Sequence, residues 1–168
     1  MGRAGNHAGV AMKSASPRGG RASGSIRVGL DVLPVARMAR LTRDNPGIQE
    51  TIFTGLELRY CLGKRRSLEH LAARFAAKEA VLKALGSGLG QRMRWTDVEI
   101  VNGVLGRPVV HLHGEVEAFA RKRGLVDLDV SLSHTSELAM AQALAVCRTP
   151  PARRRVPRKR KARAGEES

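Results

Sequence analysis

The sequence predicts an α+β fold in which an antiparallel sheet packs around one long central helix. Residues 68–85 are rich in alanine, contain no glycine or proline and end at Gly86, as a long helix does. Segments before and after this run alternate apolar with polar residues, which is typical of strands. An Asn102-Gly103 pair between two such segments indicates a hairpin, and therefore antiparallel pairing.

Residues 25–33 are predicted to form the first strand. Aliphatic residues alternate there with glycine and polar residues, which gives the strand two different faces. The aliphatic face consists of Ile26, Val28, Leu30 and Val32. We expect this face to pack on the core and Asp31 to lie on the other face, where Gly29 leaves open space beside its carboxylate.

A helix is predicted to follow at Pro34, since proline suits the first helical position. Arg37 and Arg40 would form its basic outward edge. Its inward face would consist of Val35, Met38 and Leu41 or Thr42. Residues 44–47 break this helix.

A capping box at Thr54-Gly-Leu-Glu57 predicts a short helix that ends at Leu62. A basic loop over residues 63–67 then leads into the long helix. Strands are predicted at residues 96–101 and 108–113, a helix at 114–123 and a last clear strand at 127–134. Residues 138–146 fit either a helix, by alanine propensity, or a strand with four alanines on one face.

The formal net charge of the 168 residues is +15, which is typical of proteins that bind nucleic acid. Most of this charge lies in two flanks that lack the apolar residues of a core, so we expect disordered basic extensions at 1–25 and 148–168. The domain predicted between them, residues 26–147, has 17 basic and 13 acidic residues. We expect no nucleic-acid partner for this domain. The tail run Pro157–Arg163 fits a nuclear signal, a nucleic-acid-binding arm or a plain solvated tail.

Cellular location is constrained by two weak signals. No apolar stretch approaches the roughly 20 residues that span a bilayer, so we expect no membrane segment. The two cysteines, Cys61 and Cys147, are far apart in the sequence and form no CxxC pair. We expect reduced thiols and a cytoplasmic protein.

The long helix carries the most informative residues for function. Glu79 lies at the edge of its apolar stripe, and Lys83 follows one turn later. A pair at this spacing is commonly a solvent-exposed ion pair of little energetic weight. Lys78, however, falls inside the stripe, where a purely structural helix would carry leucine, and this favours a functional site.

Asp31 and Glu79 together would make an oxygen-rich site suited to Mg²⁺, which commonly binds one or two carboxylates and substrate phosphates. Arg74, Lys78 and Lys83 would suit a substrate that carries phosphate. The glycine-rich stretch that begins at Gly86 could bring backbone amides to a phosphate group, although such a stretch after a helix is more often a plain capping loop.

Five stretches of the sequence resemble the holo-[acyl-carrier-protein] synthases, the small bacterial type of 4′-phosphopantetheinyl transferase. They are Gly29-Leu-Asp-Val32 with Arg37; Phe53-Thr54 with Glu57 and Tyr60-Cys61; Arg74-Phe-Ala-Ala-Lys-Glu-Ala80 with Lys83-Ala-Leu-Gly86; Gly106-Arg-Pro108; and Ser131-Leu-Ser-His134. The stretch over residues 74–86 is the most specific of them. The match runs in order from about residue 26 to residue 146.

The resemblance implies the fold of this transferase family and its reaction. The 4′-phosphopantetheine group would move from coenzyme A to a serine of apo-acyl carrier protein, with Mg²⁺ as cofactor and adenosine 3′,5′-bisphosphate as product, in support of fatty acid biosynthesis. A homotrimer with active sites between its subunits is also implied.

The resemblance assigns roles to individual positions of this chain. Asp31 and Glu79 match the Mg²⁺ ligands, and Glu79 is also a candidate base for the serine hydroxyl. The coenzyme-binding candidates are Arg74, Lys83, Gly86 and His134, and the catalytic candidates are Asp31, Glu79 and Lys83. The first helix, with Arg37 and Arg40, is the part that would meet the acidic carrier protein.

Two alternatives stay open at this point. The domain could be a scaffold for a nucleic-acid-binding or ribosome-associated tail, or a relative that binds carrier protein without catalysis; the intact Asp31, Glu79 and Lys83 argue against the latter. Pro34 and Asp44 depart from the family pattern on the first helix and put its detailed carrier contacts in doubt.

Overall fold

The computed structural model describes residues 24–90 and 92–148, so the two expected extensions lie almost entirely outside the described residues. The elements are β1 (Gly24–Pro34), α1 (Val35–Asp44), α2 (Ile48–Ile52), α3 (Gly55–Leu62), α4 (Ser67–Leu85), the 3-10 turn η1 (Trp95–Asp97), β2 (Val98–Asn102), the 3-10 turn η2 (Val104–Gly106), β3 (Pro108–Leu112), α5 (Gly114–Lys122), β4 (Leu125–His134) and β5 (Leu138–Arg148). The predicted α+β class is confirmed, and α2 and the two 3-10 turns are additions that no sequence pattern indicated.

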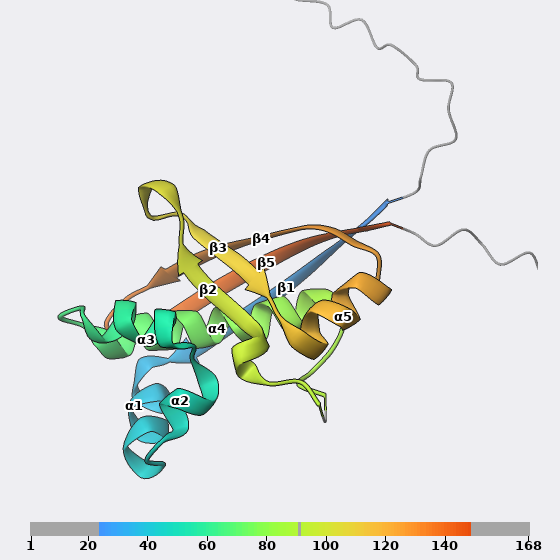
Figure 1. Cartoon of the computed structure of the whole chain (residues 1–168). Coiled ribbons are helices and arrows are strands. Elements are labelled where there is room, and N and C mark those ends of the chain that lie inside the picture. Colours follow the sequence, from blue (N-terminus) through green and yellow to red (C-terminus); the bar gives the residue numbers. More distant parts are fainter. Residues whose placement is uncertain (1–23, 91, 149–168) are drawn as a thin grey trace, which may run out of the picture.

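Two antiparallel sheets surround α4 (Figure 1). The larger sheet has the strand order β1-β5-β4, and the smaller is the β2–β3 hairpin. α4 packs on one face of the larger sheet, while β2, α3 and α1 cover other sides of the helix. β1 begins and β5 ends at the same edge, where Gly24 lies opposite Arg148. Both ends of the described domain are therefore neighbours.

α4 is buried on nearly all sides, whereas the sequence predicted a single apolar stripe. Thirteen of its nineteen residues are buried, including a run of small alanines along its length. A helix that is enclosed in this way needs no polar face over most of its surface. The helix begins one residue before the predicted start, at Ser67, and ends as predicted at Gly86, which adopts the left-handed conformation of a C-cap.

Gly29 lies where β1 crosses α4. A Cβ atom at this position would lie 1.9 Å from the carbonyl oxygen of Ala80 and 2.6 Å from the backbone nitrogen of Ala84. Only glycine permits this approach of two backbones. The space that we expected beside Asp31 is therefore filled by the backbone of α4.

The predicted orientation of β1 is wrong. Its aliphatic side chains are exposed, and the opposite face, with Gly29 and Asp31, packs towards α4. β5 continues the exposed face with Leu138, Met140 and Leu144. Alternation reveals that a strand has two faces but not which one meets the core, and here the close approach to α4 requires the face with glycine.

Residues 138–148 form a strand, which decides between the two alternatives left by the sequence. The alanines of β5 at positions 139, 141, 143 and 145 are all buried on the side of the sheet that packs on α4. Alanine has a high helix propensity, but tertiary packing outweighs it here, because only short side chains fit between the sheet and an alanine-rich helix.

β2 and β3 pair antiparallel, which confirms the predicted hairpin. Their connection is longer than a tight Asn-Gly turn, since Asn102 pairs with Pro108 and five residues lie between them. Leu105 and Gly106 both have positive φ there. Among the described residues, no helix is long and apolar enough to cross a membrane.

Candidate functional site

Asp31, Glu79 and Lys83 come together where β1 crosses α4. The Nζ atom of Lys83 lies 2.7 Å from Oδ1 of Asp31 and donates to the carbonyl oxygen of Leu30 at 3.1 Å. Lys83 thus pairs across the two elements with Asp31 and not with Glu79, the partner that helical spacing indicated. The Gly29 contact brings the strand close enough for this ion pair to form.

Glu79 is half-buried beside Asp31, and its pKa is raised above the usual value. Loss of solvent is the main cause, and the neighbouring Asp31 carboxylate adds to it, while Lys83 and Arg37 act in the opposite direction. Asp31 is paired with Lys83, whereas no ion-pair partner lies within 4 Å of Glu79 among the described residues.

The donor set fits a hard divalent cation that completes its shell with water and phosphate. Asp31 and Glu79 supply carboxylate oxygens from two different elements, and Mg²⁺ commonly takes one or two carboxylates from the protein. Within the described ranges no group of three or more His, Cys, Asp or Glu residues could hold a metal by itself. The site is therefore suited to a cation that arrives with a phosphate ligand.

Arg74 and His134 lie in a second cluster. The guanidinium of Arg74 stacks over the ring of Tyr60 at 4.2 Å and donates to Oδ1 of Asn102 at 2.6 Å. The ring of His134 meets that of His70, with centroids 4.9 Å apart. Burial and the neighbouring His134 lower the pKa of His70. The Nε atom of Arg74 is buried without a hydrogen-bond partner.

The two clusters are separate within this chain. Arg74 and Gly86 lie twelve residues apart on α4, which corresponds to about 18 Å at 1.5 Å per residue. Gly86 caps the helix beside Lys83, and its N–H is used by the carbonyl oxygens of Leu82 and Lys83. No hydrogen bond or ion pair of the described part of the chain joins Arg74 or His134 to Asp31, Glu79 or Lys83.

A hollow of about 660 Å³ lies beside the first cluster, between α1, α2 and α4. Arg37 and Arg40 lie on its wall, as does Asp44. Apolar side chains line the rest of it, among them Met38, Ile48, Phe75 and Trp95. The sequence indicated the arginines and Met38, but nothing in it signalled that Ile48 and Trp95, which lie far apart in the chain, would line one hollow.

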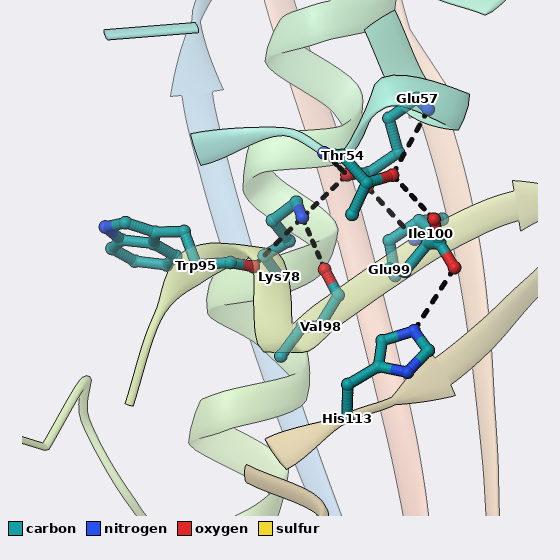
Figure 2. Close-up of polar contacts among 8 residues, drawn as sticks. All are labelled: Thr54, Glu57, Lys78, Trp95, Val98, Glu99, Ile100 and His113. Atoms are coloured by element: carbon teal, nitrogen blue, oxygen red, sulfur yellow. Dashed lines mark hydrogen bonds and ion pairs between the residues drawn. The ribbon is translucent and has the colours of Figure 1, made fainter. Parts of the chain in front are cut away.

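Lys78 makes no hydrogen bond or ion pair with either cluster in the described part of the chain. Its side chain is completely buried and its Nζ atom lies 2.8 Å from Oε2 of Glu57 (Figure 2). The same Nζ donates to the carbonyl oxygens of Trp95 and Val98. The suggestion that Lys78 would meet a phosphate is therefore wrong, because its ammonium group is enclosed by α3, η1 and β2.

Comparisons with known proteins identify the family of the chain. The family model of the 4′-phosphopantetheinyl transferase superfamily matches residues 27–147. The chain is 44% identical over 119 residues to a holo-[acyl-carrier-protein] synthase of Moorella thermoacetica, which covers 71% of this chain and 92% of that relative. It is 46% identical over 114 residues to a holo-[acyl-carrier-protein] synthase of Geobacter sulfurreducens, over 67% of this chain and 90% of that relative.

A solved structure, the Chronobacterium ammoniagenes ACPS–CoA complex, matches with a TM-score of 0.67 and 29% sequence identity, over 75% of this chain and 99% of that one. The sequence and the structure thus lead to the same group of proteins. The chain belongs to the 4′-phosphopantetheinyl transferase superfamily and, within it, to the holo-[acyl-carrier-protein] synthases.

Proposed function

We propose that this protein transfers the 4′-phosphopantetheine group from coenzyme A to a serine of apo-acyl carrier protein, with Mg²⁺ as cofactor, in support of fatty acid biosynthesis. The observation that carries the proposal is the meeting of Asp31, Glu79 and Lys83 across β1 and α4 in a chain of this family. Residues 26–147 are the catalytic domain in this proposal, and Gly24, Ser25 and Arg148 extend its strands β1 and β5.

In the transfer, the serine oxygen forms a bond to the phosphorus of the phosphopantetheine group. The bond from this phosphorus to the bridging oxygen breaks, and adenosine 3′,5′-bisphosphate leaves with the bonding electrons. Glu79 accepts the serine proton, directly or through water. Lys83 is half-exposed at the site and can turn to the attacked phosphate. Asp31 and Glu79 would hold Mg²⁺, which supplies charge neutralisation at the pyrophosphate.

Coenzyme A is the proposed phosphopantetheine donor, with Arg74, Lys83, Gly86 and His134 as its binding residues. The buried guanidinium of Arg74 and the imidazole of His134 provide groups suited to phosphate in the second cluster. We propose that the coenzyme site is shared between neighbouring subunits.

A homotrimer is the proposed assembly. The exposed face of the β1-β5-β4 sheet supports it, because aliphatic side chains of both β1 and β5 lie side by side there. They are Ile26, Val28, Leu30, Val32, Leu138, Met140 and Leu144, each between 38% and 70% exposed. A continuous apolar face of this kind marks an association surface. Association of subunits through it would also allow the first cluster of one chain to meet the second cluster of another.

The acyl carrier protein would dock on α1 and the adjacent hollow. Arg37 and Arg40 provide positive charge for an acidic partner, and the apolar lining of the hollow accepts apolar side chains of a helix. Arg37 is close enough to act on the pKa of Glu79, so a partner bound there lies next to the catalytic cluster.

The cytoplasm is the proposed location of the enzyme. Cys61 and Cys147 are both free and buried, and burial raises the pKa of Cys61 to about 11. Thiols in this state are inert packing groups of the kind common in reducing compartments.

The test is a carrier-modification assay. The purified full-length protein is incubated with coenzyme A, MgCl₂ and apo-acyl carrier protein, and the carrier is analysed by intact mass spectrometry. We expect the mass of one phosphopantetheine group to be added, and the gain to disappear with excess EDTA or with a carrier whose acceptor serine is replaced by alanine. Absence of a mass gain over several carrier proteins, with a folded enzyme, would overturn the proposal.

A further inference from the structure

The ammonium group of Lys78 is fully buried outside both clusters, and each of its three protons has an acceptor. Oε2 of Glu57 lies 2.8 Å away, the carbonyl oxygen of Trp95 accepts at 3.0 Å and that of Val98 accepts as well (Figure 2). These three acceptors match the three protons of an ammonium group. They come from α3, η1 and β2, so one side chain ties α4 to three other elements.

Glu57, the ion-pair partner of Lys78, is itself held in place by hydrogen bonds. Glu57 accepts from the backbone N–H of Thr54 at 2.8 Å and from that of Ile100 at 3.0 Å. The Thr54 hydroxyl donates to Glu99 at 2.6 Å, and Glu99 in turn meets His113 at 3.2 Å. Glu57 therefore cannot turn with α4, and the ion pair acts as a fixed point for the helix.

Stability alone does not account for a buried ion pair of this kind. Removing two charges from water is costly, and apolar side chains of similar size in their place are often neutral or stabilising. Burial lowers the pKa of Lys78, and Glu57 acts against this shift. A methionine at position 78 would fill the same space without the desolvation penalty. The pair therefore has a role besides stability.

α4 needs a directional contact because its packing has little directional preference. The helix is buried on nearly all sides and rich in alanine, so its apolar residues do not by themselves determine its rotation about its own axis. Glu79 follows Lys78 directly, about 100° further around the helix. A small rotation of α4 would carry Glu79 away from Asp31, which is held on β1. Buried polar pairs are best known for setting such a register.

We propose that Lys78, through its ion pair with Glu57, is a positioning residue that sets the rotation of α4 and so holds Glu79 towards Asp31. The inference rests on the proposed function, in which Glu79 binds the divalent cation and accepts the serine proton. It assigns no contact with substrate to Lys78. Glu57 and Lys78 act from the side of α4 opposite to the Gly29 crossing, so the helix is fixed from both sides.

The test separates positioning from stability with three variants of the full chain. Glu57→Gln and Lys78→Met each remove one charge, and we expect each to lower the melting temperature because a buried charge loses its partner. The double variant Glu57→Gln/Lys78→Met removes both charges, and we expect it to recover part of the melting temperature, because one backbone N–H at Thr54 or Ile100 and the carbonyl oxygens of Trp95 and Val98 stay without their partners. Val116→Ala is the matched control, since it opens a cavity in the core at α5, outside the network.

Three quantities are measured for each protein: the melting temperature, the affinity for Mn²⁺ alone by electron paramagnetic resonance, and kcat and KM for coenzyme A in carrier modification. For the double variant we expect Mn²⁺ affinity and kcat to fall by about tenfold or more, with a smaller change in KM. Val116→Ala is expected to melt earlier while it keeps wild-type Mn²⁺ affinity and kcat.

A double variant with wild-type Mn²⁺ affinity and kcat would overturn the inference, as would a Val116→Ala control that loses both in proportion to its stability. If the double variant does not fold, Glu57→Gln is compared with Val116→Ala at equal melting temperature. Equal Mn²⁺ affinity and kcat in these two variants would then overturn the inference. A wild-type protein that transfers nothing would overturn the proposed function itself and is recognised before any variant is compared.

Discussion

Asp31 and Glu79 approach each other from β1 and α4, with a single lysine, Lys83, paired to one of them at 2.7 Å. Among the described residues Glu79 has no ion-pair partner within 4 Å, and its pKa is raised by burial and by Asp31. At the scale of single residues, the arrangement is a pair of neighbouring carboxylates of which only Asp31 has a direct ion-pair partner. This is the electrostatic condition that favours a divalent cation.

Asp31→Ala is expected to lower the rate of carrier modification by about 100-fold or more, since it removes a proposed metal ligand and the partner of Lys83. The melting temperature should change little, because the Asp31–Lys83 pair is partly exposed and such pairs contribute little to stability. Initial rates and thermal melts monitored by circular dichroism provide both quantities. Glu117→Ala is the control, as it breaks an exposed ion pair on α5. A near-wild-type rate for Asp31→Ala would show that the metal assignment is wrong.

Glu79→Gln is expected to stabilise the metal-free protein at neutral pH. A raised pKa in the folded state means that folding favours the protonated form, so the charged form of Glu79 lowers stability as the pH rises through its folded-state pKa. The gain should therefore be present at neutral pH and disappear below the ordinary value of 4.5. Thermal melts in EDTA from pH 4 to 8 measure it. An equal or lower melting temperature for the variant at pH 7 would contradict the prediction.

The crossing of β1 and α4 is the contact between elements on which the site depends. Gly29 lets the strand approach the backbone of the helix, and the alanines of β5 allow the rest of the sheet to follow. Asp31 can meet Lys83 only because the two backbones are this close. The small residues in both elements therefore make the proposed site possible, although they carry no functional group themselves.

Gly29→Ala is expected to destabilise the fold by about 3 kcal/mol or more, because the added methyl group overlaps backbone atoms that cannot move without shifting a whole element. Urea unfolding measures this free energy. Gly55→Ala is the matched control, since its Cβ would meet only the Arg59 side chain at 3.5 Å, and we expect a change within about 0.5 kcal/mol. Equal unfolding free energies for the two variants would refute the argument.

At the scale of the whole molecule, the main feature is the exposed face of the β1-β5-β4 sheet, which carries aliphatic side chains. β1 and β5 pair along their full length, so the aliphatic side chains of the two strands form one continuous surface opposite α4. A single chain has no described element to cover this surface. Association with other copies of the chain would cover it, and would also unite clusters that stay separate in one chain.

Val28→Glu is expected to reduce the proposed trimer to monomers, because it places a charge in the middle of the apolar face, opposite Leu144. Light scattering after size-exclusion chromatography measures the mass, and carrier modification should fall together with it. Leu56→Glu is the matched control, because Leu56 is similarly exposed on α3, away from the sheet. A wild-type protein that is already a monomer, or a trimer that persists in Val28→Glu, would exclude this face as the interface.

The sequence by itself determined the α+β class, the order and approximate bounds of most elements, and the residue types of the site. These follow from local patterns: alternation in β1 and β4, the Asn102-Gly103 pair between β2 and β3, the capping box before α3 and the alanine run of α4. It also led to Asp31, Glu79 and Lys83 as one group, since a strand and the adjacent long helix were expected to pack together.

Tertiary structure alone decided which side of β1 is buried, where Lys78 points, and that Arg74 and His134 form a cluster of their own. An alternating strand has two faces, and only the partner element selects one of them; here the closest approach to α4 requires glycine. The role of the buried Lys78 likewise becomes clear only from its acceptors, which lie far from it in the sequence. Local patterns describe what each segment can do, whereas contacts between distant segments determine what it does.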